Sequence, residues 1–176
     1  MNRTIYLAGG CFWGIEHLMK ALPGVIETTC GYANGTGEQD ADYRTVCTGR
    51  TGFRETVKVV FDDTATSVDA LLYALFHVID PEAVNRQAHD IGTQYQAGVF
   101  WTPGDEEVAE DVHRVMDVER AHYDHFAVEE KPLENFFDAE EYHQDYLDKN
   151  PDGYCHVPRA TIAQLASTPF DEGYYR

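Results

Sequence analysis

The sequence has few basic residues and no run of hydrophobic residues long enough to cross a membrane. Lys and Arg number 13 against 31 Asp and Glu in 176 residues, so the formal net charge is −18. Such a surface repels phosphate backbones and anionic lipids, and we expect neither nucleic acid nor membrane as a partner. The first residues lack the apolar centre of a secretory signal, which predicts a cytoplasmic protein.

Cysteine is scarce, and its copies form no metal-binding pattern. The cysteines are Cys11, Cys30, Cys47 and Cys155. None forms a Cys-x-x-Cys pair, which argues against a zinc ribbon or a thioredoxin-type redox motif. His122 and His125 are the only close histidine pair, and they fit one exposed helix face better than a metal site. We expect reduced thiols, no metal and no organic cofactor.

The stretch from Gly9 to Gly14 places a cysteine at a strand-to-helix turn. Residues 4–7 read as a strand, and apolar residues recur at helical spacing over residues 12–22. Free backbone N–H groups and the helix dipole stabilise a thiolate there, which predicts a lowered pKa for Cys11. A single cysteine is more often a small buried hydrophobe. The two aromatic residues directly after this one favour a nucleophile beside an apolar pocket.

The remaining pattern alternates strands and helices. Further strands are expected over residues 25–32, 56–61, 95–101 and 127–129, and further helices over residues 68–79, 103–125 and 139–147. In the second strand, Ile26 and Cys30 are expected on one face. The order strand, helix, strand, strand, helix, strand is typical of the split βαβ arrangement, and right-handed crossovers put both helices on one face.

These elements predict a single α+β domain over residues 1–176. Its core, about residues 4–130, is expected to be a two-layer ferredoxin-like fold, followed by a C-terminal extension over 131–176 with a helix and a polar tail. Two long polar stretches, residues 33–53 and 80–94, interrupt the core. Loops of this length in a compact domain are usually functional.

Four polar residues of these stretches and their borders stand out as candidates: Tyr43, Glu55, Asp90 and Tyr95. Each alone is most often a solvated side chain. Together with Cys11 they supply a thiol, an acid and hydroxyl donors. That set suits the reduction of a polarised oxide on a small apolar group.

Several blocks of the sequence resemble one known family, in family order from about residue 4 to 155. The blocks are Gly10-Cys11-Phe12-Trp13-Gly14, Gly31-Tyr32-Ala33-Asn34-Gly35, residues 43–49, Thr51-Gly52, Asn85-Arg86-Gln87, residues 90–95, residues 141–147 and residues 150–155. They are similar to peptide methionine sulfoxide reductases of the A type. The resemblance implies reduction of methionine S-sulfoxide, peptide-bound or free, as protein repair under oxidative stress.

The resemblance also implies a role for each candidate. Cys11 would attack the sulfoxide sulfur, Glu55 would protonate the departing oxygen, and Tyr43 and Tyr95 would donate hydrogen bonds to it. A sulfoxide oxygen leaves only when protonated, so Glu55 is expected to be a carboxylic acid kept neutral by burial.

Further roles concern the substrate and the recycling of the nucleophile. Phe12 and Trp13 would hold the S-methyl group, and Asp90 would orient the substrate backbone. Cys11 would become a sulfenic acid, with Cys155 in a mobile tail forming the disulfide that thioredoxin reduces. Cys47 remains an alternative partner. The enzyme is expected to act as a monomer.

Two departures from the family pattern surround the site. The usual Gly-His-Ala-Glu is here Gly52-Phe53-Arg54-Glu55, and the usual Gln-Tyr-Arg-Ser is Gln94-Tyr95-Gln96-Ala97. A basic residue is thereby lost. Two rival classes stay open: a thiol peroxidase, which would also use an activated cysteine at a helix start, and a non-catalytic module that binds methionine oxide.

Overall fold

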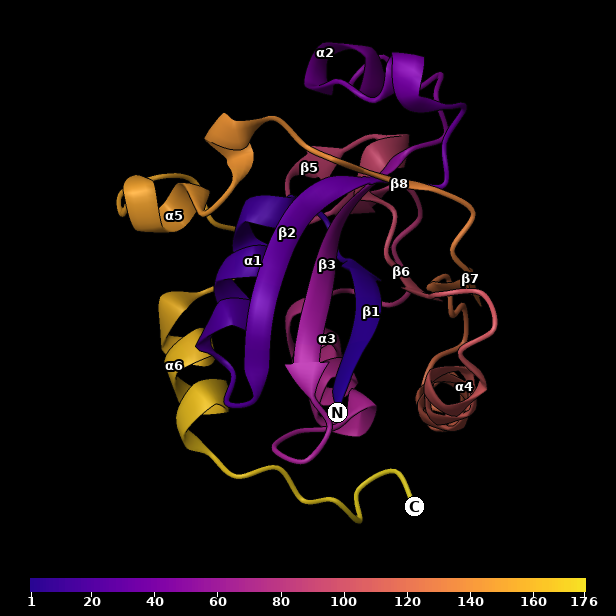
Figure 1. The fold of residues 1–176 in the computed structure, drawn as a ribbon, viewed down its shortest axis with the longest axis vertical. Helices are drawn as coiled ribbons and strands as arrows, with labels where there is room; N and C mark the ends of the chain where they lie inside the picture. The colour runs from indigo at the N-terminus through magenta and orange to yellow at the C-terminus, as the bar shows by residue number, and fades with distance from the viewer.

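A six-stranded mixed sheet forms the centre of the computed structural model, which describes residues 1–176 (Figure 1). Its strand order is β7-β6-β1-β3-β2-β8. The bounds are β1 Asn2–Ala8, β2 Val25–Ala33, β3 Arg54–Asp62, β6 Gly98–Trp101, β7 Glu129–Pro132 and β8 Phe136–Asp138. All neighbours pair antiparallel except β6 and β7, which are parallel. A separate hairpin joins β4 Arg86–Gln87 to β5 Asp90–Ile91.

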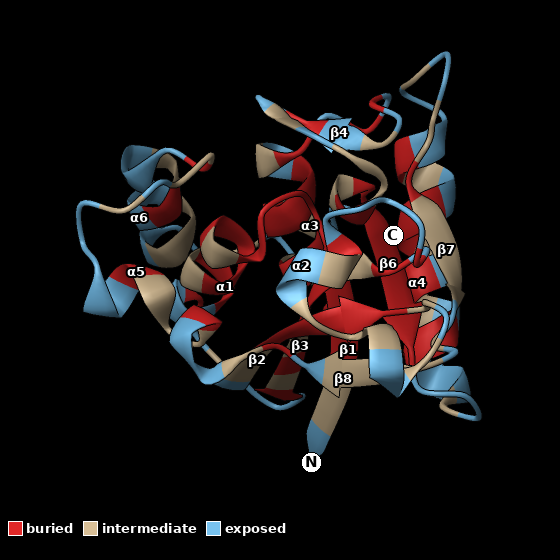
Figure 2. Cartoon of the chain, turned by 90° about the horizontal axis from the view of Figure 1, so that it is seen from above, coloured by how far each residue is buried: buried red, intermediate tan, exposed pale blue.

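Three long helices and three short ones surround the sheet. The long ones are α1 Phe12–Ala21, α3 Val68–Val78 and α4 Glu106–Arg120, and the short ones are α2 Tyr43–Val46, α5 Tyr146–Lys149 and α6 Arg159–Ser167. Figure 2 shows the central strands buried and α2 exposed above them. No helix of the protein combines the length and the hydrophobicity that a membrane span requires.

One hydrophobic core joins the sheet to α1, α3 and α4. Alternate residues of β1 and β3, such as Ile5 and Val57, meet Leu18 of α1 and Leu72 of α3. The opposite face of β1 carries a small second cluster around Tyr6. The helices expected over residues 12–22 and 68–79 are confirmed as α1 and α3, and their apolar stripes are buried in this core. The Ser67 side chain caps α3 by accepting from the backbone N–H of Ala70.

The strand expected over residues 95–101 begins only at Gly98. Tyr95 ends a 3₁₀ turn, η2 (Thr93–Tyr95), instead of opening the strand. The N–H of Gln96 donates back to the carbonyl of Thr93, which closes the turn. The Gln96 side chain is buried and bonds to Asn85 and Ala127. The strand expected over residues 127–129 begins two residues later, as β7 (Glu129–Pro132).

The helix expected over residues 139–147 is wrong. The chain instead forms a 3₁₀ turn, η3 (Glu141–His143), and the short α5, divided at Asp145. Asp145 has a φ of 53°, in the left-handed region, and its N–H donates to the buried carboxyl of Glu16. A side chain from α1 therefore takes the backbone group that a continuous helix would have used.

Other local expectations also fail. A bulge between Val25 and Glu27 turns Ile26 outward, so that it does not share the buried face of Cys30. Helix α4 ends at Arg120, which leaves the His122 and His125 pair beyond it and not on one helix face. Strand β8, α2 and α6 were not predicted, because each is short or lacks a strong apolar period.

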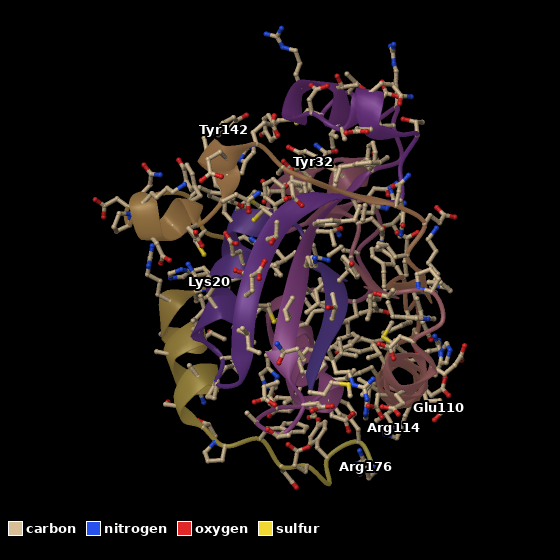
Figure 3. The ribbon with its side chains drawn as sticks, viewed as in Figure 1. Lys20, Tyr32, Glu110, Arg114, Tyr142 and Arg176 are labelled. Carbon is tan, nitrogen blue, oxygen red and sulfur yellow. The ribbon has the colours of Figure 1, made fainter.

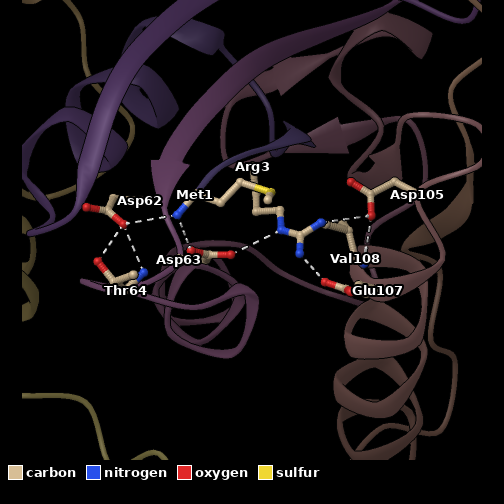
Figure 4. A network of polar contacts seen from close by, with 8 residues as sticks. All are labelled: Met1, Arg3, Asp62, Asp63, Thr64, Asp105, Glu107 and Val108. Carbon is tan, nitrogen blue, oxygen red and sulfur yellow. Dashed lines mark hydrogen bonds and ion pairs between the residues drawn. The ribbon is translucent and has the colours of Figure 1, made fainter.

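Ion pairs on the acidic surface connect segments distant in sequence. Figure 4 shows Arg3 of β1 reaching Asp63 at 3.2 Å, Asp105 at 3.8 Å and Glu107. Asp105 also accepts from the N–H of Val108 and caps α4. Elsewhere on the surface, Arg114 of α4 and the last residue, Arg176, lie close together in Figure 3. Both pair with the buried carboxylate of Asp69.

Candidate active site

Cys11 lies between the end of β1 and the first residue of α1. It is the N-cap residue of that helix and is buried. Gly10 before it has a φ of 93°, and a Cβ there would lie 2.7 Å from Cβ of Gln87. A side chain at position 10 would meet both backbone strain and a collision, so glycine is required for this approach to the nucleophile.

A small cavity of about 90 Å³ opens beside Cys11. Its walls are Cys11, Phe12, Trp13, Tyr43, Glu55, Asp90, Tyr95 and Tyr154. The structure therefore brings together every residue singled out in the sequence for the substrate pocket, from five segments of the chain. Sites for whole ligands are usually about 300–1,000 Å³, so this cavity suits the end of one side chain.

Glu55 of β3 supplies a buried carboxyl to the cavity. It is 2% exposed, and its Oε1 accepts from the N–H of Phe12 at 3.1 Å. Burial, against the opposing effect of that hydrogen bond and with a smaller contribution from the nearby Asp90, raises the pKa of Glu55 to about 8. Most Glu55 side chains therefore carry a proton at neutral pH, as expected from the sequence, and can donate it.

The expectation of a lowered pKa for Cys11 is wrong. Burial raises the pKa of this thiol far above its usual range, and Glu55 raises it further. The N–H groups of Trp13 and Gly14 act in the opposite direction but do not prevail. Removing a charge from water outweighs the field of one helix end, so the resting nucleophile is a thiol.

Tyr43 and Tyr95 line the same cavity. Burial raises the pKa of both Tyr43 and Tyr95, so each phenol keeps its hydrogen at neutral pH and remains a donor. Tyr43 begins α2, and its backbone N–H donates to Oε2 of Glu140 at 3.0 Å. The cavity thus offers several donors to one ligand oxygen.

Tyr154 is a pocket residue that the sequence reasoning missed. Its hydroxyl donates to Oδ2 of Asp90 at 2.9 Å, which links the C-terminal segment to the β4–β5 hairpin. The signal was present, because Tyr154 directly precedes Cys155 in one of the family-like blocks. Only the thiol of that block was assigned a role.

Cys155 lies outside the cavity wall, in a segment that is anchored and not loose. Its Sγ donates to the carbonyl of Val157 at 3.1 Å, and Val157 is buried in the core. The next ring, His156, bonds to the carbonyl of Gly9 at 2.9 Å. A Cβ at Gly14 would lie 2.9 Å from this ring. In this structure the segment expected as a tail packs beside the start of α1.

The other two cysteines and the residues that depart from the family pattern near Glu55 do not line the cavity. Cys30 is fully buried, as expected, and Cys47 is exposed. Arg54 donates to Glu129 at 2.8 Å and to the carbonyl of Thr93, so it does not line the cavity. Phe53 is buried in the core. Arg54 therefore does not replace the missing basic residue.

No other part of the protein offers comparable chemistry. A larger cavity of about 210 Å³ lies between α3, α6 and the C-terminal segment, but no cysteine lines it. The structure contains no cluster of three or more His, Cys, Asp or Glu side chains arranged to hold a metal ion. The candidate site is the cavity beside Cys11.

Comparison with known proteins agrees with this geometry. The family model described as "Peptide methionine sulfoxide reductase" matches residues 3–172. The chain belongs to this family. A relative in Clostridium acetobutylicum, named peptide methionine sulfoxide reductase MsrA, is 46% identical over 161 residues, covering 91% of this chain and 98% of the relative. The protein of the same name in Mycoplasma genitalium is 44% identical over 156 residues, covering 88% and 98%.

Solved structures of methionine sulfoxide reductases share the α+β fold. Mxr1 from Saccharomyces cerevisiae in its reduced form matches with a TM-score of 0.81 and 33% identity, covering 89% of this chain and 91% of Mxr1. Methionine sulfoxide reductase A of Corynebacterium diphtheriae matches with a TM-score of 0.80 and 34% identity, covering 89% and 83%. The similarity extends over nearly the whole chain.

Proposed function

We propose that the protein reduces methionine S-sulfoxide, peptide-bound or free, to methionine. One observation carries the proposal: a neutral buried acid, Glu55, and a thiol, Cys11, face one small cavity with aromatic walls. Family membership supports the same reaction. The cavity size supports a substrate that inserts only the methyl sulfoxide end of its side chain, so that a peptide backbone stays outside.

The first step transfers oxygen from the substrate to the enzyme. Glu55 donates its proton to the sulfoxide oxygen, and Tyr43 and Tyr95 donate hydrogen bonds to it. Cys11 attacks the sulfur as its own proton leaves for the oxygen. The site therefore holds no buried thiolate before the substrate binds. The attack forms a bond between Cys11 Sγ and the substrate sulfur, and the S–O bond breaks to release the twice-protonated oxygen as water. That water attacks Cys11 Sγ and returns a proton to Glu55, which breaks the S–S bond and leaves methionine and a Cys11 sulfenic acid. The thiol thereby loses the two electrons that the sulfoxide gains.

The second step regenerates the nucleophile. The thiol of Cys155 condenses with the sulfenic acid, releasing water and forming a disulfide, and a thioredoxin dithiol then reduces that disulfide by exchange. Mxr1 has been solved in a reduced form, in an "unusual oxidized form" and in complex with Trx2. These titles describe that relative, and they support a redox cycle with an external protein for this chain.

The rival classes fit the site less well. A thiol peroxidase relies on a thiolate, whereas burial raises the pKa of Cys11. A module that only binds methionine oxide gains nothing from a protonated carboxyl at the cavity wall. The pairing of Cys11 with Glu55 supports reduction over both alternatives.

We also propose the finer architecture and setting expected from the sequence. The antiparallel order β6-β1-β3-β2, with α1 and α3 as crossovers, supports a ferredoxin-like core in a single domain. Residues 131–176 then form the extension. We propose a monomer that works in the cytoplasm with thioredoxin and oxidised proteins as partners, without a metal or organic cofactor.

The two epimers of methionine sulfoxide test the proposed function. The aromatic rings of Phe12 and Trp13 fix the methyl group, and the donors fix the oxygen, so inversion at sulfur exchanges groups that the pocket treats differently. We expect thioredoxin-coupled turnover of the S epimer and almost none of the R epimer. Comparable turnover of both epimers, or oxidation of Cys11 by peroxide alone, would contradict the proposal.

A further inference from the structure

The indole of Trp13 is fixed by a residue far away in the sequence, His143. The indole Nε1–H donates to Nδ1 of His143 at 3.0 Å. His143 is 1% exposed, and its ring also lies against two other pocket residues, with centroids 5.0 Å from Phe12 and 4.9 Å from Tyr43. The buried imidazole thus contacts three residues of the cavity wall, Phe12, Trp13 and Tyr43, although it does not line the cavity itself.

The hydrogen bond defines the state of the imidazole. Because Nδ1 accepts from the indole, the hydrogen of the neutral ring sits on Nε2, which is buried without a partner. Burial lowers the pKa of His143, which keeps the ring neutral and Nδ1 an acceptor. A buried polar atom without a partner is costly, and the arrangement persists because its neighbours hold it.

The segment that carries His143 is bonded firmly to the sheet. Gln144 bonds both the N–H and the carbonyl of Cys30, each at 2.8 Å. Glu140 accepts from the Tyr32 hydroxyl at 2.8 Å as well as from the N–H of Tyr43. Figure 3 shows Tyr32 of β2 and Tyr142 of η3 near each other at this end of the sheet.

A second contact restrains the same indole in a different direction. Tyr146 stacks on Trp13 with ring centroids 3.6 Å apart and planes 11° apart. The stack fixes the plane of the indole but does not distinguish the two orientations related by a 180° turn about Cβ–Cγ. The hydrogen bond to His143 selects one of them, so the edge of the indole that lies at the cavity is defined.

We propose that His143 is a positioning residue that selects one of the two flipped orientations of the Trp13 indole and thereby sets the width of the pocket for the S-methyl group. The inference rests on the proposed function, because it assigns the methyl group to this wall. It identifies a determinant of specificity: with His143 in place, the indole edge excludes alkyl groups larger than methyl.

The test compares two replacements of the acceptor. His143→Asn keeps an oxygen close to the position of Nδ1, whereas His143→Phe keeps a ring but removes the acceptor. The indole N–H resonance of Trp13 in ¹⁵N-labelled protein, assigned by its loss in Trp13→Phe, reports the bond directly. Single-turnover reduction of methyl and ethyl sulfoxides by the Cys155→Ser protein reports pocket width without involving the recycling step.

We expect His143→Phe to shift the Trp13 resonance, to raise the half-saturating concentration of the methyl sulfoxide roughly tenfold with a smaller change in the maximal single-turnover rate, and to reduce the preference for methyl over ethyl. His143→Asn should keep the Trp13 resonance, the half-saturating concentration and the preference for methyl close to their wild-type values. In the Trp13→Phe background, replacing His143 should add little. An unmoved resonance, additive effects or an Asn variant as impaired as Phe would overturn the assignment. An intact resonance pattern with no sulfoxide reduction by wild-type protein would instead overturn the proposed function.

Discussion

Glu55 and Cys11 face each other in an environment that keeps both of them uncharged. Burial raises the pKa of the carboxyl and of the thiol, and a negative charge on Glu55 would raise the pKa of the Cys11 thiol further. The resting pair therefore holds two protons, one for the departing oxygen and one that leaves the nucleophile. This differs from sites in which a thiolate waits for its substrate.

Replacing Glu55 with Gln keeps the shape of the side chain but removes its transferable proton. We expect the rate of sulfoxide reduction to fall by roughly 100- to 10,000-fold, with little change in substrate binding. Single-turnover formation of methionine, measured with saturating sulfoxide, checks this. Wild-type rates for Glu55→Gln across neutral pH would show that another group protonates the oxygen.

The same carboxyl makes stability depend on pH. Its pKa rises from the ordinary 4.5 to about 8 on folding, so within that interval the folded protein holds a proton that the unfolded chain has released. The free energy of unfolding should therefore fall as the pH increases from 4.5 to about 8. The loss from this group should be on the order of a few kcal/mol.

Urea unfolding at a series of pH values measures this dependence. Glu55→Gln provides the matched control, because it has no proton to release and should lose the part of the slope that belongs to Glu55. A wild-type and variant pair with the same slope over this interval would contradict the assignment of a raised pKa to Glu55.

Among the elements, those with a strong period were predictable from sequence and those fixed by distant side chains were not. Leu71, Leu72 and Leu75 mark α3 by spacing alone, and all are buried. Residues 139–147 lack such a stripe, and Glu16 of α1 breaks the helix at Asp145. Nothing local in the sequence reveals a bond across that distance.

The features of the site also divide into those that the sequence predicted and those that it did not. Local motifs indicated Cys11 and Glu55 as pocket residues, and the structure brings them together. The direction of the Cys11 pKa shift could not be predicted, because burial depends on residues from β3 and from the C-terminal segment. His143 also escaped notice, since a histidine in a polar segment gives no sign of the indole that it binds.

Gln144 replaces a neighbouring strand at one position of β2. Its amide satisfies the N–H and the carbonyl of Cys30 beyond the point where β8 stops pairing. Gln144→Ala removes the amide that binds the N–H of this fully buried residue, whereas the carbonyl keeps the N–H of Ala139 as a donor. We expect the free energy of unfolding to fall by about 2 kcal/mol, measured by urea titration. Gln39→Ala, at an exposed position, is the control and should change little.

On the scale of the whole molecule, catalysis and recycling depend on the packing of the C-terminal segment against α1. We expect Cys155→Ser to preserve one stoichiometric turnover and to lose thioredoxin-supported cycling, while Cys11→Ser loses both. Mass spectrometry after treatment with sulfoxide alone should find a Cys11–Cys155 disulfide. A disulfide between Cys11 and Cys47, with Cys155→Ser still cycling, would mean that the exposed loop thiol is the partner.

Cys47→Ser is the matched control for that experiment. Residue 47 is more exposed than Cys155 and caps the C-terminal end of α2. We expect this variant to cycle at the wild-type rate.

The order in which a ribosome makes this chain gives the position of Tyr154 and His143 a further meaning. The nucleophile emerges among the first residues, whereas the partners of Asp90 and Trp13 emerge among the last. A nascent or truncated chain ending before residue 140 carries the reactive sulfur without the supports of its pocket. The complete pocket therefore exists only when nearly the whole chain has been made.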